Sequence, residues 1–76
     1  MKILLLNPNM TQSMTDNMAA IARAVVGDAA EIIPVTATRG FPYIASRAEA
    51  QIAGGLVLEM IAEHESSVDA VVIAAF

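Results

Sequence analysis

The chain has 76 residues, of which 57% are hydrophobic and 16% are charged, and its net charge is −4. The four basic residues are scattered, so no basic stripe can neutralise phosphates and we expect no nucleic-acid partner. The sequence contains no cysteine, which excludes disulfides, thiolate nucleophiles and cysteine-ligated metals. No segment approaches the roughly 20 apolar residues that span a bilayer, so we expect a cytoplasmic protein without a membrane partner.

The first apolar run, Ile3 to Leu6, predicts a strand rather than a signal peptide. It stops at Asn7, well short of the apolar core of roughly 7–15 residues that a signal peptide needs. A continuous apolar run that ends at an Asn-Pro turn is typical of a strand covered on both faces, as in a parallel sheet.

A helix is predicted after this strand. Ser13 and Asp16 have the spacing of a capping box, and Thr11 is an alternative cap. Gly27 is well placed to end the helix in a left-handed conformation. The apolar residues at helical spacing, which we expect to form its buried stripe, are Met14, Met18, Ile21, Ala22 and Val25.

Residues 31–37 are rich in β-branched side chains and predict a second strand. Pro34 cannot donate a hydrogen bond to a neighbouring strand, so we expect this strand at an edge of the sheet.

A long helix capped by Ser46 and ending at Glu63 is predicted after a loop over residues 38–43. Gly54 and Gly55 fall inside it, although each glycine costs ~1 kcal/mol there relative to alanine. Close packing against a neighbouring backbone would explain the pair. The residues expected on the apolar face are Ala45, Ala48, Ile52, Leu56 and Met60, widened by Val57 and Ile61.

The apolar segment 69–76 predicts a third strand and completes a strand-helix-strand-helix-strand order. This order predicts an α/β fold, with a parallel sheet between two helical layers and right-handed crossovers. The edge position required by Pro34 selects the flavodoxin-like strand order 2-1-3, in which strands one and three are neighbours. Strand three is then left as a bare edge, so we expect the chain to be a fragment or first lobe of a larger protein.

The order 2-1-3 places the segment after strand one beside the end of strand three, at the topological switch point where such folds bind ligands. Asn7, Asn9 and Thr11 lie in this polar segment, between a strand end and a helix start. Backbone N–H groups and the helix dipole favour a carboxylate or oxyanion there. The alternative interpretation is an ordinary turn followed by a helix cap.

Other polar residues give weaker indications. Arg47 lies in the first turn of the second helix, where a bound anion would offset the unfavourable dipole, or it is simply solvated and paired with a nearby glutamate. His64 is expected to be a cation at a helix terminus. The acidic residues do not cluster, so no metal site is expected, and no glycine-rich nucleotide motif follows strand one.

Three segments together resemble the hydantoin racemase branch of the aspartate/glutamate racemase superfamily. They are Lys2–Asn9 with Thr11, Met14 and Thr15; Gly40–Ile44; and Asp69–Phe76. The resemblance implies a two-lobed α/β enzyme with the active site between the lobes, in which residues 1–76 are the N-terminal part of the first lobe and the rest lies outside them. It also implies no cofactor, a homo-oligomeric complete protein, and racemisation at the carbon next to a carbonyl or carboxylate of a small amino-acid-like or hydantoin-like acid.

The resemblance also implies roles for individual residues. Racemising members use two cysteines, one thiolate that removes a proton and one thiol that returns a proton from the opposite face. The first belongs at the position of Ala75, which can do neither, so no catalytic residue is assigned in this chain and we expect the 76 residues alone to be inactive. The implied substrate-binding residues are Asn7, Asn9, Thr11, Ile44, Arg47, Ala75 and Phe76.

Three alternatives remain open. One is a one-cysteine decarboxylase or isomerase of the same superfamily, which the alanine at position 75 would suit. Another is a non-catalytic protein that binds a small acid or serves as an accessory protein. The third is a flavodoxin-like module without inherited chemistry.

Overall fold

The computed structural model describes residues 1–74; Ala75 and Phe76 lie outside the described residues. The elements follow the predicted order: β1 (Lys2–Asn7), α1 (Gln12–Val26), β2 (Glu31–Thr36), α2 (Arg47–His64) and β3 (Ala70–Ile73). A short 3₁₀ turn follows each helix. No helix in the described part of the chain is long and apolar enough to cross a bilayer.

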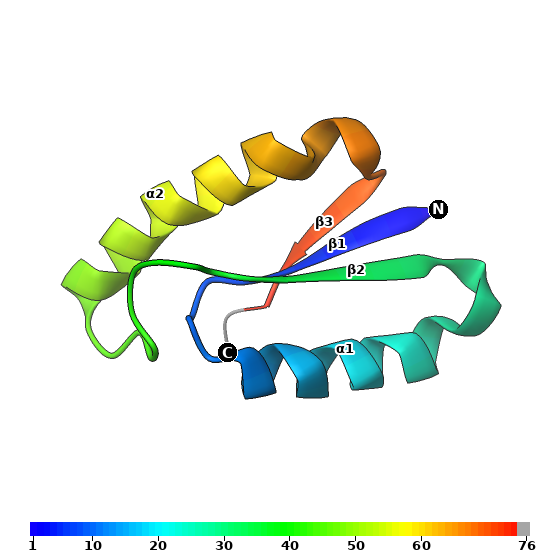
Figure 1. Cartoon of the computed structure of the whole chain (residues 1–76), viewed down its shortest axis with the longest axis horizontal. Helices are drawn as coiled ribbons and strands as arrows, with labels where there is room; N and C mark the ends of the chain where they lie inside the picture. Colours follow the sequence, from blue (N-terminus) through cyan, green and yellow to red (C-terminus); the bar gives the residue numbers. More distant parts are fainter. Residues whose placement is uncertain (75–76) are drawn as a thin grey trace.

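The described strands form one parallel sheet in the order β2-β1-β3, which confirms the prediction drawn from Pro34. The two helices cover opposite faces of this sheet, so the predicted three-layer α/β arrangement is also confirmed (Figure 1). β1 pairs with β2 along its whole length and with β3 from Ile3 to Leu6. The ladder continues beyond β3, since the N–H of Ala74 donates to the carbonyl of Leu6 at 2.8 Å.

The central strand divides its side chains between the two layers. Leu4 and Leu6 are fully buried in a cluster with Val57 and Met60 of α2. Leu5 belongs to a second cluster, which includes Ala19 of α1. Because successive side chains of a strand point to opposite faces, even-numbered residues of β1 face α2 and odd-numbered residues face α1.

The ends of α1 differ from the prediction in part. Thr11 occupies the N-cap position without a side-chain capping bond, and Ser13 lies inside the helix, so the capping box at Ser13 was wrong. Gly27 ends the helix with the predicted positive φ, 54°, and its N–H donates to the carbonyl of Arg23. Its ψ of −128° lies outside the left-handed helical region.

The buried face of α1 is displaced from the predicted stripe. Thr15 and Ala19 are its buried residues, whereas Ile21 and Val25 are 67% and 80% exposed, contrary to the prediction. The helix carries apolar residues over a wide sector, and the sector next to the sheet is the one with small side chains, which allow close approach. Met18 and Ala22 pack at its margin, as predicted.

The buried face of α2 is also rotated, although its cap is as predicted. The hydroxyl of Ser46 accepts a hydrogen bond from the N–H of Glu49 at 3.1 Å. The buried residues are Ala53, Val57 and Met60, whereas the predicted Ala45, Ala48 and Ile52 are exposed. Apolar residues occur on every side of this helix, so their spacing does not single out one face.

The expected close packing at Gly54 and Gly55 is absent from the described residues. A Cβ atom added at either glycine would meet no heavy atom within 4 Å.

Candidate functional site

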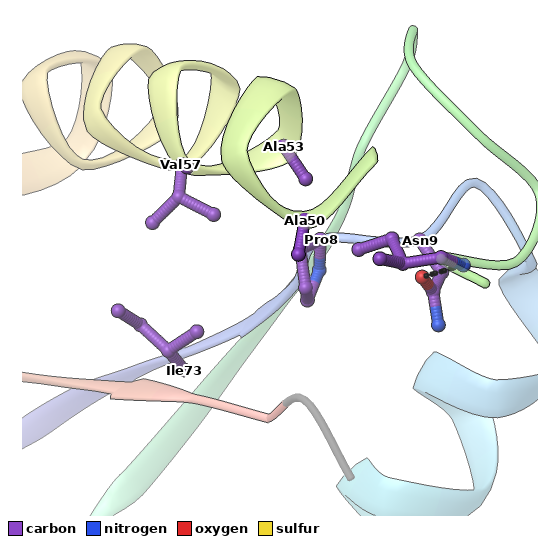
Figure 2. A pocket seen from close by; sticks show the side chains of 8 residues that line it. Pro8, Asn9, Ala50, Ala53, Val57 and Ile73 are labelled. Atoms are coloured by element: carbon purple, nitrogen blue, oxygen red, sulfur yellow. Dashed lines mark hydrogen bonds between the residues drawn. The ribbon is translucent and has the colours of Figure 1, made fainter. Parts of the chain in front are cut away.

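A pocket of about 420 Å³ lies between α2 and the carboxyl ends of β1 and β3, at the predicted switch point. In Figure 2, Ala50, Ala53 and Val57 of α2 lie across from Ile73 of β3, with Pro8 and Asn9 at one side. The lining residues are Pro8, Asn9, Ile44, Ala50, Ala53, Gly54, Val57 and Ile73.

Strand alternation decides which residues reach this pocket. Leu4 and Leu6 face α2, and Pro8 continues this even-numbered series beyond the end of β1. Ile73 is the register partner of Leu6 on β3 and lines the same side. On α2, Ala50, Ala53 and Val57 follow one another at three- and four-residue spacing, which keeps them on one helix face. Two alanines and a glycine on this face leave the space unfilled.

One side of the pocket is formed by Pro8 and Asn9 of the loop after β1 and by Ile44 of the loop before α2, and these two loops are joined by hydrogen bonds. The side-chain oxygen of Asn9 accepts from the N–H of Ile44 at 3.2 Å. The N–H of Met10 donates to the carbonyl of Phe41 at 2.9 Å, and the hydroxyl of Thr11 donates to the carbonyl of Pro42 at 2.6 Å. The loop after β1 therefore fixes the loop that precedes α2.

Asn7 has a different environment, because it belongs to the odd-numbered series that faces α1. It is fully buried, and its Nδ2 donates to the carbonyl of Thr11 at 3.2 Å and to Oγ1 of Thr15 at 3.0 Å. Its Oδ1 accepts from the N–H of Asn9 at 2.9 Å. Asn7 does not line the pocket, and its direct role in substrate binding stays a prediction.

Further hydrogen bonds continue from the Asn7–Thr15 contact along the α1 side of the sheet. The hydroxyls of Thr15 and Thr36 lie 2.6 Å apart, and the Thr36 hydroxyl donates to Oε1 of Gln12 at 2.9 Å. Sequence reasoning assigned no contact to Thr15, Thr36 or Gln12, because these hydrogen bonds join three segments that only the folded chain brings together.

Comparison with known proteins identifies the family. A family model described as Asp/Glu/hydantoin racemase matches residues 3–76. The chain belongs to the Asp/Glu/hydantoin racemase family. The resemblance of its three sequence segments to the hydantoin racemase branch is thereby confirmed. No curated protein matches the chain.

Two solved structures of allantoin racemases resemble this racemase-family chain. The enzyme from Pseudomonas fluorescens is 32% identical with a TM-score of 0.90, and the match covers 97% of this chain and 32% of that one. The enzyme from Klebsiella pneumoniae is 40% identical with a TM-score of 0.86, and the match covers 96% and 30%. The chain thus spans about a third of the length of each.

The pocket of this racemase-family chain is apolar and uncharged. Asn9 is the one lining residue with a polar side chain, and its amide nitrogen lies 3.8 Å from Sδ of Met14. None of the eight described lining residues can exchange a proton near neutral pH, because none has an ionisable side chain. Among residues 1–74, no group of three His, Asp or Glu side chains could hold a metal ion.

The predicted site residues divide into three groups. Asn9 and Ile44 line the pocket. Asn7, Thr11 and Arg47 do not: Asn7 is bonded to Thr15 on the α1 side, Thr11 is bonded to Pro42, and Arg47 is the exposed first residue of α2. The roles predicted for Ala75 and Phe76 fall outside the described residues.

His64 lies at the opposite end of α2 from the pocket, as expected for a residue at a helix terminus. Its Nδ1 is 2.9 Å from the carbonyl oxygen of Met60.

Several lining residues were not predicted as site residues, namely Pro8, Ala50, Ala53, Gly54, Val57 and Ile73. They are apolar, so their types carry no chemical signal. The useful signal was the pair Gly54-Gly55, two glycines inside a helix whose cost needed an explanation.

Proposed function

We propose that the full-length protein is a cofactor-independent racemase or isomerase that acts at the carbon next to a carbonyl of a small hydantoin-like acid. The match to the Asp/Glu/hydantoin racemase family over residues 3–76 carries the proposal. The switch-point pocket supports it, because about 420 Å³ lies within the range of roughly 300–1,000 Å³ that small-molecule sites occupy.

The two allantoin racemases favour a hydantoin ring as the substrate class, since allantoin is a hydantoin that bears a ureido group. The ring carbon that racemises carries a hydrogen next to a carbonyl. Removing this proton leaves an enolate with its charge on the carbonyl oxygen, and returning a proton to the other face inverts the carbon. We propose that the apolar wall holds the ring and excludes water, while Asn9 supplies an amide at the edge.

The groups that move the proton must come from outside the eight lining residues, because these cannot ionise. The family resemblance puts the first of two cysteines at position 75, where this chain has Ala75. The side chain of Ala75 cannot exchange a proton, so it cannot serve as the first thiol of a two-thiol mechanism. This single residue favours the second candidate function, a one-cysteine decarboxylase or isomerase, or a protein that binds a small acid without turning it over.

We also propose that residues 1–76 are the N-terminal part of a first lobe, in a homo-oligomeric protein of the cytoplasm. The matched structures are about three times as long as the chain. Apolar side chains exposed on β3 and on both helices support this organisation, because a further lobe segment or subunit would cover them. They are Ile21, Val25, Ile52, Leu58 and Val72. Leu4, Leu5 and Leu6 of β1 are buried in the core, which supports a core strand rather than a signal peptide and agrees with the proposed cytoplasmic location.

Exchange in D₂O tests the proposed activity. Full-length protein is incubated separately with hydantoins, allantoin, amino acids and arylmalonates. Deuterium uptake at the carbon next to the carbonyl is followed by NMR, optical rotation by polarimetry, and carbon dioxide release by gas analysis.

Deuterium uptake with loss of optical rotation on a hydantoin supports a racemase. Carbon dioxide release from an arylmalonate supports the decarboxylase alternative. Binding detected by calorimetry without either reaction supports the non-catalytic alternative. A protein that neither binds nor converts any of these compounds would refute all three.

A further inference from the structure

Gly54 occupies a position where nothing in the described residues requires a glycine. It lies in the interior of α2, where glycine costs ~1 kcal/mol relative to alanine. Its φ is not positive; only Gly27 and Gly40 have positive φ among the described glycines. A Cβ atom at Gly54 would meet no heavy atom within 4 Å. The penalty is therefore not explained by backbone conformation or by packing within residues 1–74.

Gly54 borders the pocket. Gly54 lies four residues after Ala50 and three residues before Val57, and all three line the pocket from one face of α2. Any side chain at position 54 would project from this wall, between two residues that already border the cavity. The missing side chain enlarges the pocket.

We propose that Gly54 is a specificity-determining residue, which leaves room for the substituent on the reacting carbon of the substrate. This inference rests on the proposed function and deepens it, because it names the part of the wall that limits substituent size. An alanine at position 54 would stabilise the helix but would add a methyl group at the border of the pocket.

Gly55 provides a matched control in the same helix. It bears the same helix penalty, and a Cβ atom there would also meet nothing within 4 Å. It lies about 100° further round the helix and does not line the pocket. Gly54→Ala and Gly55→Ala therefore share their effect on helix stability and differ in their effect on the pocket.

The test uses the full-length protein and both variants. Binding of hydantoin, 5-methylhydantoin, 5-isopropylhydantoin and 5-benzylhydantoin is measured by calorimetry, deuterium exchange is measured on the same series, and thermal unfolding is recorded. We expect both variants to unfold at a higher temperature than the parent protein. We expect only Gly54→Ala to raise the Kd of the larger ligands, by about 10-fold or more relative to its effect on hydantoin. This is the size of effect that one extra methylene group has in a hydrophobic pocket.

Three results would overturn the inference. One is the same binding pattern in both variants, and another is an equal loss for every ligand in Gly54→Ala. The third is failure of Gly54→Ala to fold while Gly55→Ala folds, since this would reveal a packing requirement. The failure of the proposed function is separate: size-dependent binding without deuterium exchange in the parent protein would refute the activity but not the role of Gly54.

Discussion

The side-chain amide of Asn7 donates a hydrogen bond to the hydroxyl of Thr15, 3.0 Å away, with both residues almost completely buried. This bond joins the last residue of β1 to the first turn of α1. Because Asn7 also bonds to Thr11 and Asn9, it shapes the loop from which Asn9 reaches the pocket. The residue therefore has a structural role that is independent of any contact with substrate.

Replacing Asn7 by alanine is expected to destabilise the fold by about 2–4 kcal/mol, since three side-chain hydrogen bonds of about 1 kcal/mol each are lost and buried partners are left unpaired. Urea denaturation followed by circular dichroism measures the change. Asn17→Ala is the control, because Asn17 is exposed on α1 and its loss should change stability by less than about 0.5 kcal/mol. Equal stability of the two variants would contradict the structural role.

Replacing Asn9 by alanine is expected to weaken ligand binding. The variant loses the hydrogen bond that holds Ile44 in the pocket wall, worth about 0.5–1.5 kcal/mol, which corresponds to a roughly 2- to 12-fold rise in Kd for a hydantoin. Calorimetric titration of the full-length variant measures Kd. Asn17→Ala again provides the comparison, and an unchanged Kd in Asn9→Ala would show that this bond does not support the wall.

Filling the pocket from α2 is expected to abolish most of the proposed deuterium exchange on a hydantoin without unfolding the protein. Ala50 is exposed and lines the pocket, so Ala50→Leu should reduce kcat/KM about 10-fold or more. Ala62 is also exposed on α2 but does not line the pocket, which makes Ala62→Leu the matched control. If both variants retain full activity, the substrate binds elsewhere.

Introducing a cysteine at position 75 is expected to raise the rate of proton exchange. The family resemblance implies a thiol at this position, and a positioned acid or base contributes about 10²- to 10⁴-fold. Deuterium uptake by a hydantoin, compared between Ala75→Cys and the parent protein, measures the gain. Ala45→Cys adds a thiol at an exposed residue and should leave the rate unchanged. No gain at position 75 would argue against a lost two-thiol mechanism.

Element order and sheet topology could be predicted from the sequence because each depended on local chemistry. Pro34 restricts β2 to an edge, Ser46 caps α2, and Gly27 ends α1 with positive φ. These are properties of single residues and their neighbours, and no distant contact is needed to interpret them.

The buried faces of the helices and the pocket lining could not be predicted in the same way. Apolar residues occupy several sides of α2, and contacts with the sheet select Ala53, Val57 and Met60. For Asn7, strand alternation would have indicated the α1 side, but its bond to Thr15 depends on how the helix is seated. The pocket itself results from missing volume at Ala50 and Gly54, and residue type alone does not reveal an unfilled space.

The three hydrogen bonds between the loop after β1 and the loop before α2 have a consequence for binding. Since Asn9, Met10 and Thr11 hold Phe41, Pro42 and Ile44 within the folded chain itself, this wall is already in position before a ligand arrives. A ligand that docks against a preorganised surface loses little affinity to the ordering of loops. The choice between ligands at these loops is then governed by how well the shape of each ligand fits a rigid surface.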